Sequence, residues 1–361
     1  MIPVTRSFLP PIEEYIKYLE GIWERGHLTN HGPLVLELEE KLRNLLGVKH
    51  FFFVTNGTIA LQVAIRAAGM EGEVITTPFS YVATTSSLVW EHCKPVFADI
   101  DPETFTISPD SIKAVITPAT RGILATHVYG KPCQVDAIEA IAKEHNLKVI
   151  YDAAHAFGVE FKGQSVLNYG DISTLSFHAT KLFHTIEGGA IITADDELAH
   201  RISYMRNFGH NGPEAFYGMG INGKASEFQA AMGLCLLPHL DEIIIARKEI
   251  CARYDQQLSG LSKVKRLRIT EGTSLYNYAY YPVVFQDEQT LLKVKEALDS
   301  SGIFGIRYFY PLLNTLNYVK NNLVNDNAGE ISKRVFCLPL FPELDERIVD
   351  QISELISDML C

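Results

Sequence analysis

The stretch GILATHVYGKPCQVDAIEAIAKEHNLKVIYDAAH, residues 122–155, carries the clearest indication of fold class. It begins with the apolar run GILATHVYG and ends with a similar run, KVIYDAAH, and both have the composition of buried strands. Between them, VDAIEAIAKEHN places its apolar residues at helical spacing. A strand, a helix and a second strand in this order indicate a parallel sheet that is covered by helices.

The same alternation extends in both directions along the chain. The other apolar runs bounded by turn residues are HFFFVT, EVITTP, KPVFADI, ISTLSF and GAIITA. A helical pattern, IALQVAIRAAG (59–69), follows the first of them. We therefore expect an α/β fold with a largely parallel sheet and helices on both faces. Such sheets bind ligands beyond the carboxyl ends of their strands, and the residues at or near these ends are Thr55, His127, Asp152 and Ser176.

The character of the sequence changes after about residue 240. A long charged helix (241–260) is followed by the strand-like YNYAYYPVVF (276–285) and the helix-like TLLKVKEALDSSG (290–302). We expect three parts: an N-terminal segment, 1–30, that packs with the small domain, a large domain, 31–245, and a smaller α+β domain, 246–361.

The composition of the chain argues against several classes of function. The net charge of −11, from 32 basic and 43 acidic residues, gives no general electrostatic reason to bind nucleic acid or an anionic membrane. The six cysteines are scattered without a CxxC pair, so they predict buried thiols rather than a metal site or a disulfide framework. Because no signal-peptide pattern and no run of about 18 uncharged apolar residues occurs, we expect a cytoplasmic protein without a membrane segment.

The first motif of chemical interest is TNGTIAL (55–61). A strand ends at Thr55, Asn56 and Gly57 form a tight turn, and a helix begins near Thr58. Glycine permits close approach of the backbone, and the free amides at a helix start attract a phosphate. An ordinary strand-to-helix turn with Thr58 as N-cap is an equally good interpretation of this motif alone.

The second motif, VIYDAAHAFG (149–158), ends a central strand with a carboxylate and an imidazole. Burying Asp152 without a cation is costly, and no lysine or arginine stands beside it in the sequence. Alternatively, Asp152 caps a following helix and His155 is a hydrogen-bonded core residue. The motif alone leaves both interpretations open.

The third motif, SFHATKLFHTIEGGAIIT (176–193), places Ser176 at a strand end and Lys181 in the loop that follows. An amine in a partly dry, cationic pocket has a lowered pKa and becomes nucleophilic. A lone lysine is usually a solvated surface charge. The combination of a phosphate cradle, a buried aspartate, a serine and a lysine is what pyridoxal phosphate requires.

Together with GINGKASEFQAA (220–231), these motifs resemble the DegT/DnrJ/EryC1/StrS family of pyridoxal phosphate-dependent nucleotide-sugar aminotransferases, and the resemblance runs over nearly the whole chain. It implies fold type I, with a mostly parallel seven-stranded sheet in the large domain. It also implies a homodimer with shared active sites and pyridoxal 5'-phosphate as cofactor. Glutamate and a nucleotide sugar would be the two substrates.

The resemblance also implies roles for individual residues. Lys181 would bond to the cofactor and then shuttle the proton, Asp152 would pair with the ring nitrogen, and His155 would contact the ring hydroxyl. The remaining cofactor contacts would come from the phosphate-binding residues Gly57, Thr58 and Ser176, the stacking ring of Tyr81, and Asn222, which would reach the cofactor of the neighbouring subunit. The segments TNHGP (29–33) and RYFYPLL (307–313), which would close over the substrate, supply Thr29, Arg307 and Tyr308, although ordinary packing explains these segments equally well. Lys224 stands where the family pattern often has arginine, and it would grip a phosphate or carboxylate of the substrate without the bidentate fork of an arginine.

The residues around the lysine favour one position of amination. Relatives that aminate C3 of a keto sugar carry an aromatic-proline pair before the lysine and GDGGA after it, whereas this chain has SFHATK and IEGGA. His178 and Glu187 are therefore the positions that resemble the C4 aminotransferases. We expect a nucleotide-linked 4-keto-6-deoxyhexose, dTDP-4-keto-6-deoxyglucose, as substrate and a 4-amino-4,6-dideoxy sugar nucleotide as product.

Several alternatives stay open at this point. The chain fits a C3 aminotransferase less well, and a sugar dehydratase of the same fold would carry histidine in place of Lys181, although His178 and His184 lie near. A non-catalytic sensor would need an appended DNA-binding segment, which we do not find. A nicotinamide oxidoreductase is disfavoured because no GxGxxG follows a strand.

Overall fold

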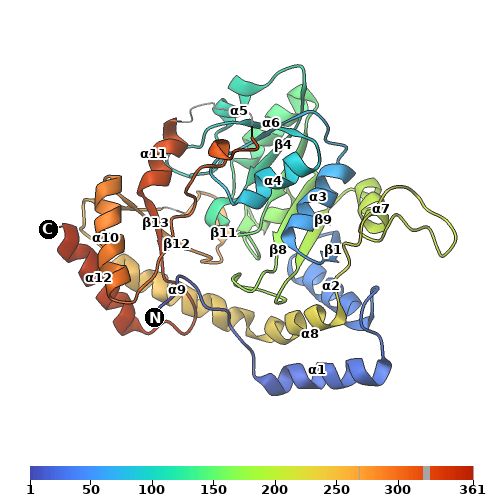
Figure 1. Ribbon diagram of the computed structural model, residues 1–361, viewed down its shortest axis with the longest axis horizontal. Helices are drawn as coiled ribbons and strands as arrows, with labels where there is room; N and C mark the ends of the chain where they lie inside the picture. The colour runs from blue at the N-terminus through green and yellow to red at the C-terminus, as the bar shows by residue number, and fades with distance from the viewer. Residues whose placement is uncertain (268, 320–325, 361) are drawn as a thin grey trace.

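A seven-stranded sheet forms the centre of the molecule (Figure 1). The computed structural model describes residues 1–267, 269–319 and 326–360. The strand order is β1-β9-β8-β5-β4-β2-β3, and the strands are β1 (His50–Val54), β2 (Glu73–Thr76), β3 (Lys94–Phe97), β4 (Thr120–Thr126), β5 (Lys148–Asp152), β8 (Ile172–Ser176) and β9 (Gly189–Thr193). β9 is antiparallel to both of its neighbours, and the other pairs are parallel. The predicted α/β class and mostly parallel seven-stranded sheet are confirmed.

Helices cover both faces of this sheet, as the alternating sequence predicts. They are α2 (Pro33–Leu45), α3 (Gly57–Ala67), α4 (Val82–Trp90), α5 (Pro109–Val115), α6 (Val135–His145), α7 (Asp196–Met205) and α8 (Glu227–Leu236). On β5, Ile150 packs in the core beneath α3 and α7, whereas Val149 and Tyr151 pack in the core beneath α5 and α6. Successive side chains of a strand point to opposite faces, so a strand that is buried on both faces is apolar throughout.

The turn after β1 differs in one respect from the sequence prediction. α3 begins at Gly57, and its N-cap is Asn56, whose side chain accepts a hydrogen bond from the Ile59 amide at 2.9 Å. Thr58 is therefore not the cap, and the alternative interpretation of TNGTIAL, an ordinary turn with Thr58 as N-cap, is wrong on this point. Asparagine and threonine are both good N-caps, so the sequence alone does not fix which of two neighbours is used.

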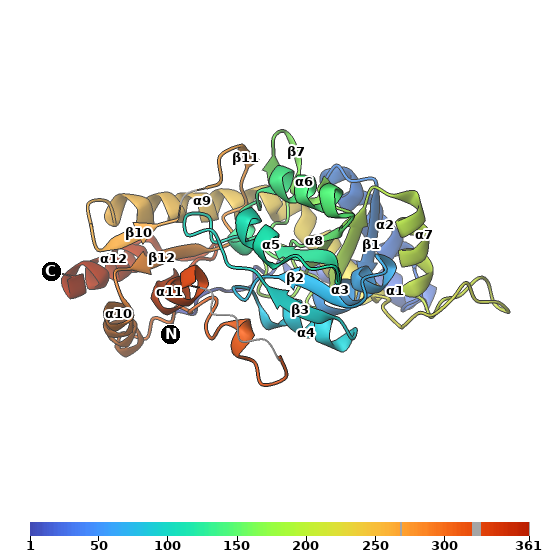
Figure 2. The ribbon, with the colours of Figure 1, turned by 90° about the horizontal axis from the view of Figure 1, so that it is seen from above.

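The C-terminal part has a core of its own (Figure 2). Its antiparallel sheet has the order β10-β12-β13, and its elements are α9 (Leu240–Gln257), β10 (Val264–Arg266), β12 (Tyr281–Phe285), α10 (Glu288–Ser300), α11 (Asp326–Arg334), β13 (Val335–Leu338) and α12 (Glu346–Leu360). A further small sheet joins β11 (Thr273–Leu275) to β6 (Glu160–Phe161) and β7 (Gln164–Ser165). The short helices are η1 (Val128–Gly130), η2 (Val166–Asn168), η3 (Leu237–His239) and η4 (Leu313–Thr315).

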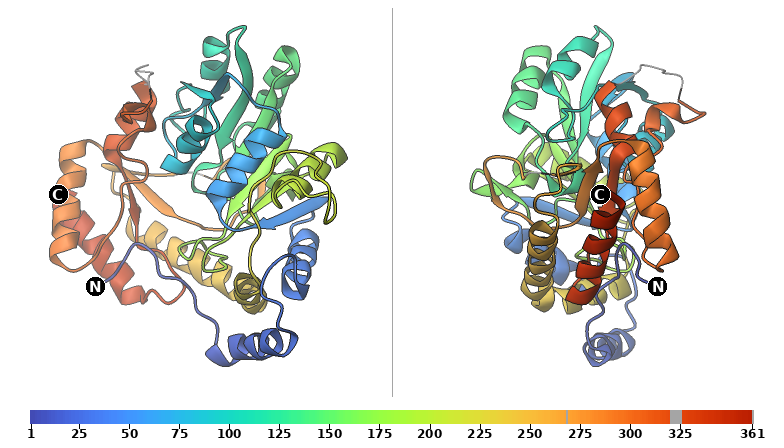
Figure 3. Two further views of the ribbon diagram at one scale, coloured as in Figure 1. Left: turned by 45° about the vertical axis from the view of Figure 1, so that its right-hand side comes forward. Right: turned by 90° about the vertical axis from the view of Figure 1, so that its left-hand side faces the viewer.

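The N-terminal segment contacts both parts of the chain. Ile2 forms a β-bridge with Ile303, and the carbonyl of Val4 accepts a hydrogen bond from the Leu340 amide at 2.9 Å. Helix α1 (Ile12–Arg25) lies instead along α8 (Figure 3). The domain boundaries at residues 30 and 245 stay a prediction, and α9 runs without a break across the second of them.

Two features of the core bear on the sequence expectations. Five cysteines, Cys93, Cys133, Cys235, Cys251 and Cys337, are free and buried, as predicted, and Cys361 lies outside the described residues. The helical stretch Glu227–Gln257 passes a length and hydropathy test for a membrane span, but 50% of the apolar window is buried inside the fold. It packs against α1, α2 and α12, which is the behaviour of a core helix.

Candidate functional site

A cavity of about 310 Å³ opens at the carboxyl ends of β4, β5 and β8. This is the edge at which open α/β sheets bind their ligands. The cavity is lined by all the predicted cofactor residues except Asn222: Gly57, Thr58, Tyr81, Asp152, His155, Ser176 and Lys181. Of the four predicted substrate residues, Tyr308 lines it.

Lys181 stands in the loop between β8 and β9. The backbone turns here because the Lys181 amide donates to the His178 carbonyl at 2.8 Å. Its Nζ donates to the Tyr280 hydroxyl at 3.3 Å. Burial lowers the pKa of Lys181 to about 8, and the charges of Asp152 and Tyr81 oppose this shift. The amine is therefore unprotonated near neutral pH in a minor fraction that is far larger than for an ordinary lysine, and this is the state that acts as nucleophile or base.

Asp152 ends β5 with its side chain buried at 5% exposure. The segment that follows is a turn, so Asp152 does not cap a helix. Its Oδ2 accepts a hydrogen bond from the Thr84 hydroxyl at 2.7 Å, and its Oδ1 accepts one from the Ala154 amide at 3.1 Å. Burial raises the pKa of Asp152, while these two donors and the charge of Lys181 lower it. A cationic group in the cavity would further favour the ionised carboxylate.

His155 is held as a neutral imidazole. Its Nδ1 accepts a hydrogen bond from the Tyr129 amide at 3.2 Å, so the ring proton belongs on Nε2. Burial, with a smaller contribution from Lys181, lowers the pKa of His155 well below its ordinary value. The ring packs at 4.5 Å from that of Tyr280. His155 can therefore donate one hydrogen bond from Nε2 to a ligand oxygen.

The N-terminus of α3 forms another wall of the cavity. The first amides of a helix have no partner within the helix, and they attract anions together with the helix dipole. A Cβ placed on Gly57 would lie 3.0 Å from the Cβ of Ser176 and 3.3 Å from its Oγ. Glycine is thus required for the close approach of the helix to Ser176. The hydroxyls of Thr58 and Ser176 and these amides make a suitable phosphate cradle.

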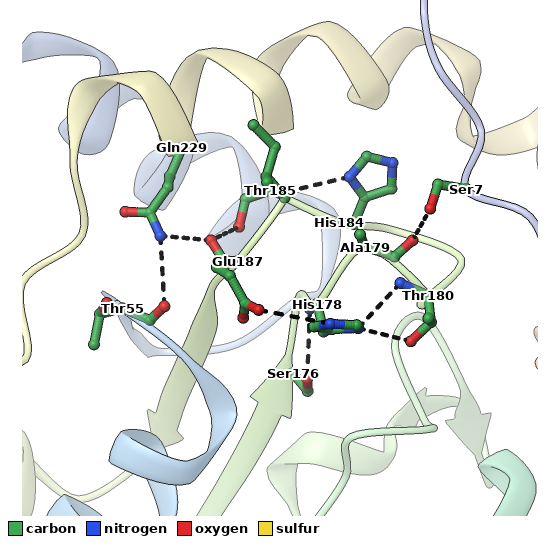
Figure 4. Close-up of polar contacts among 11 residues, drawn as sticks. Ser7, Thr55, Ser176, His178, Ala179, Thr180, His184, Thr185, Glu187 and Gln229 are labelled. Atoms are coloured by element: carbon green, nitrogen blue, oxygen red, sulfur yellow. Dashed lines mark hydrogen bonds and ion pairs between the residues drawn. The ribbon is translucent and has the colours of Figure 1, made fainter.

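The loop around Lys181 is tied to its surroundings by polar contacts (Figure 4). His178 Nδ1 is 2.9 Å from the Thr180 hydroxyl and accepts from the Thr180 amide at 3.2 Å, and its Nε2 lies 3.6 Å from Glu187. The backbone carbonyl of Glu187 accepts from the side chain of Gln229 on α8 at 2.6 Å. His178 and Glu187 distinguish this chain from the pattern of the C3 aminotransferases, and they therefore contact each other at the cavity wall.

The N-terminal segment also contacts this loop. The Ser7 hydroxyl donates to the Ala179 carbonyl at 2.6 Å (Figure 4). His184 Nε2 donates to the Phe8 carbonyl at 2.8 Å. Burial lowers the pKa of His184, which keeps its ring neutral. His184 is thus a structural contact of the Lys181 loop, and it lies outside the cavity wall.

Four residues expected from the resemblance do not line the cavity. Thr29 is exposed in the turn before α2, and Asn222 is exposed at the end of the long loop between α7 and α8. The Nζ of Lys224 lies 4.4 Å from the ring centroid of Phe208. The guanidinium of Arg307 donates to Glu288 at 2.7 Å and packs on the Tyr310 ring. Their roles in binding stay predictions.

Several cavity residues were missed by the sequence prediction. Tyr280 and Phe309 come from the C-terminal part, and Ser80 and Thr126 come from the loop after β2 and the end of β4. The sequence predicts a strand over the aromatic run that contains Tyr280, whereas β12 begins at Tyr281, one residue after it. Thr126 directly precedes His127, which the sequence places at or near the end of a strand. This position is the signal by which Thr126 could have been identified as a site residue. Tyr280 and Phe309 carry no local motif.

The residues present fit pyridoxal phosphate. A phosphate cradle, a buried carboxylate and an amine of lowered pKa surround one cavity, and the half-exposed ring of Tyr81 lies on its wall. Asp152 has the chemistry to pair with a protonated ring nitrogen, and Lys181 has the chemistry to bond to an aldehyde. His155 is able to donate to a ring hydroxyl.

Comparison with known proteins agrees with this geometry. The chain is 44% identical to the dTDP-4-amino-4,6-dideoxy-D-glucose transaminase of Shigella dysenteriae over 99% of this chain and 98% of that protein. It is 40% identical to the transaminase of the same name from Escherichia coli, over 98% of each chain. The crystal structure of DesI in the presence of its TDP-sugar product matches with a TM-score of 0.93 and 34% identity, covering 98% of this chain and 92% of DesI. The model of the DegT/DnrJ/EryC1/StrS aminotransferase family matches residues 11–357, and the chain belongs to this family.

Proposed function

We propose that this chain is a pyridoxal phosphate-dependent aminotransferase that converts dTDP-4-keto-6-deoxyglucose to dTDP-4-amino-4,6-dideoxy-D-glucose, with glutamate as amino donor. The observation that carries the proposal is the convergence of Lys181, Asp152 and the N-terminus of α3 on one cavity. The sugar and its configuration are inferred from relatives of 40% and 44% identity that are named for this product. The 4-amino position agrees with the residues His178 and Glu187.

In this mechanism the cofactor would supply an electron sink for the carbon that loses its proton. Lys181 is the residue that would bond to the cofactor, and its freed Nζ would take that proton and return it to the carbon on the other side of the bridging nitrogen. Asp152 would hold the ring-nitrogen proton, and His155 Nε2 would donate to the ring hydroxyl. The amides at Gly57 and Thr58, with the Ser176 hydroxyl, would hold the phosphate. Tyr81 would cover one face of the ring.

The alternatives are not favoured. A C3 aminotransferase would act on a different keto sugar, and the two relatives of 40% and 44% identity described above are named for a 4-amino sugar. A dehydratase of this fold would carry histidine where Lys181 stands. His178 is held by Thr180 on one side and faces Glu187 on the other, and it does not replace that lysine.

Product analysis tests the proposal. Purified protein with pyridoxal phosphate and glutamate is incubated with 3-keto and 4-keto sugars linked to dTDP or UDP, and the products are identified by mass spectrometry and NMR. We expect amination at C4 of the dTDP 4-keto sugar with one 2-oxoglutarate released per amine. Amination at C3, or a deoxy sugar without nitrogen, would contradict the proposal.

We also propose that the enzyme is a homodimer whose active sites are shared. The long loop between α7 and α8 extends away from the body of the molecule (Figure 2). It presents an unusual number of exposed apolar side chains: Phe208, Phe216, Tyr217, Met219 and Ile221. Such a group of side chains supports a protein interface, and Asn222 at its end would then reach the partner's cofactor. Sedimentation analysis of the protein and of Phe216→Asp tests this, since a fully active monomer would contradict it.

The cytoplasmic location inferred from composition stays a prediction. Fractionation of cells that produce the protein, followed by detection in each fraction, would test it.

A further inference from the structure

Three buried hydroxyl groups form a chain that ends on Asp152. The Thr84 hydroxyl donates to Asp152 Oδ2 at 2.7 Å, Ser80 Oγ lies 2.8 Å from Thr84 Oγ1, and Thr126 Oγ1 lies 2.9 Å from Ser80 Oγ. Thr84 is 0% exposed, Ser80 2% and Thr126 3%. They belong to α4, to the loop before α4 and to the end of β4. The Thr84–Asp152 and Ser80–Thr126 contacts are therefore tertiary ones, whereas Ser80 and Thr84 are four residues apart at the start of α4.

The chain has a single possible direction. An ionised carboxylate only accepts hydrogen bonds, so Thr84 gives its one hydroxyl proton to Asp152. Ser80 must then donate to Thr84, and Thr126 must donate to Ser80. Every proton in the chain points toward Asp152, and hydrogen bonds in series strengthen one another in a buried setting.

These donors also orient the carboxylate. Oδ2 is held by Thr84 and Oδ1 by the Ala154 amide, so one donor on each oxygen fixes the plane of the group. Each oxygen retains another lone pair, and Asp152 lines the cavity. Burial alone raises the pKa of Asp152, and the donors, together with Lys181, act against it. Without Thr84, the ionised form would lose one of its stabilising partners.

We propose that Thr84 is a positioning residue that fixes Asp152 as the acceptor facing the ring nitrogen of pyridoxal phosphate, with Ser80 and Thr126 as the donors behind it. The inference rests on the proposed function, because the ring nitrogen is its target. Thr84 is not among the described residues that line the cavity, so it acts through Asp152.

The same helix offers a matched control. Thr85 follows Thr84, is also 0% exposed, and its Oγ1 has no hydrogen-bond partner among the described residues. Thr85→Val therefore removes an equivalent buried hydroxyl without touching Asp152. Thr84→Ser keeps the donor and removes a methyl group, and Ser80→Ala removes the donor behind Thr84 together with the acceptor of Thr126. Together these variants separate hydrogen bonding from packing.

The experiment uses each full-length protein reconstituted with pyridoxal phosphate labelled with ¹⁵N in the ring. The ¹⁵N chemical shift reports whether the ring nitrogen is protonated, and equilibrium dialysis gives the Kd of the cofactor. In Thr84→Val we expect the shift to move toward that of an unprotonated pyridine and the Kd to rise roughly tenfold. Ser80→Ala should move the shift less and in the same direction, and Thr84→Ser and Thr85→Val should match the wild type.

Two results would overturn the inference while leaving the proposed function intact. One is a wild-type shift and Kd in Thr84→Val, and the other is an equal loss in Thr85→Val, which would assign the effect to packing of α4. Failure of the wild-type protein to bind pyridoxal phosphate would overturn the proposed function and the inference together. Circular dichroism of each variant verifies that it is folded.

Discussion

The Nζ of Lys181 lies 3.3 Å from the hydroxyl oxygen of Tyr280, a residue 99 positions away in the sequence. The contact joins the loop between β8 and β9 to the segment that leads into β12 in the C-terminal part. Burial raises the pKa of Tyr280, so its hydroxyl is neutral and accepts from the protonated amine. The protonation state of Lys181 therefore depends on residues from both parts of the chain.

Replacing Tyr280 with phenylalanine should alter the lysine while retaining the ring. Loss of the acceptor disfavours the ammonium form and lowers the pKa of Lys181 below its present value of about 8. We expect the acid limb of the kcat profile to move to lower pH and kcat to fall roughly tenfold, because proton transfer is less well positioned. The measurement is the pH dependence of the half-reaction with glutamate. Tyr278→Phe is the control, and an unchanged profile in Tyr280→Phe would count against the contact.

Asp152→Asn should lower the turnover of the enzyme with cofactor and raise the stability of the enzyme without cofactor. With cofactor, the loss of negative charge at the ring nitrogen should reduce turnover by roughly 10²- to 10³-fold and weaken cofactor binding. Without cofactor, the variant should be more stable than the wild type at neutral pH. Burial raises the pKa of Asp152 in the folded state, so stability is lost as the pH rises above the ordinary carboxyl range. Thermal unfolding of both forms checks the two signs.

Gly57→Ala should weaken cofactor binding through the phosphate cradle. The added Cβ would lie 3.0 Å from the Cβ of Ser176 and push the two walls of the cradle apart. We expect roughly a tenfold rise in the Kd of pyridoxal phosphate, from the loss of about one hydrogen bond to a charged group. Gly329→Ala in α11 is the control, since its Cβ would meet nothing within 4 Å. Equal affinity in Gly57→Ala and Gly329→Ala would show that the cradle does not depend on this glycine.

Acidification should destabilise the protein through His127. Its ring is 0% exposed and stacks on Tyr151 at 4.6 Å, and burial lowers its pKa to about 3 from the ordinary 6.5. The unfolded chain takes up the proton first, so stability falls as the pH drops below 6.5. At about pH 5.5 the loss from this one group is about 1.4 kcal/mol.

Denaturant unfolding between pH 7 and 5.5 measures how steeply the free energy of unfolding falls as the pH drops. His127→Gln should flatten this dependence, because glutamine can accept from the Cys133 amide as His127 Nδ1 does at 3.0 Å and does not titrate. Exposed His145→Gln is the matched control and should leave the slope unchanged. A slope that is equally steep in His127→Gln would exclude His127 as its source.

Much of the sheet could be predicted because its strands carry their own signals. The strand segments VIY (149–151) and GILA (122–125) are apolar throughout, and this is required of strands that are buried on both faces. Lys181 and Asp152 could be found in the same way, since Asp152 ends a strand that is recognisable in the sequence and Lys181 follows another. Their meeting at one cavity follows from the common edge of parallel strands.

The rest of the site depends on tertiary contacts that no local pattern reveals. Thr84 is 68 positions from Asp152, and Tyr280 comes from the other part of the chain. The charge of Arg307 suits a pyrophosphate, and in this structure Glu288 and the Lys333 carbonyl hold its guanidinium, so its role in binding stays a prediction. The sequence indicates which side chains are able to bind, whereas packing determines which of them face the cavity.

Borohydride reduction followed by peptide mass spectrometry tests the covalent role of Lys181. The protein is reconstituted with pyridoxal phosphate, reduced and digested, and Lys181→Ala is treated in parallel after circular dichroism shows that it is folded. We expect the reduced cofactor on the peptide that contains Lys181, and no label and no turnover in Lys181→Ala. An unlabelled wild-type protein, or a label on another buried lysine such as Lys131, would contradict the mechanism.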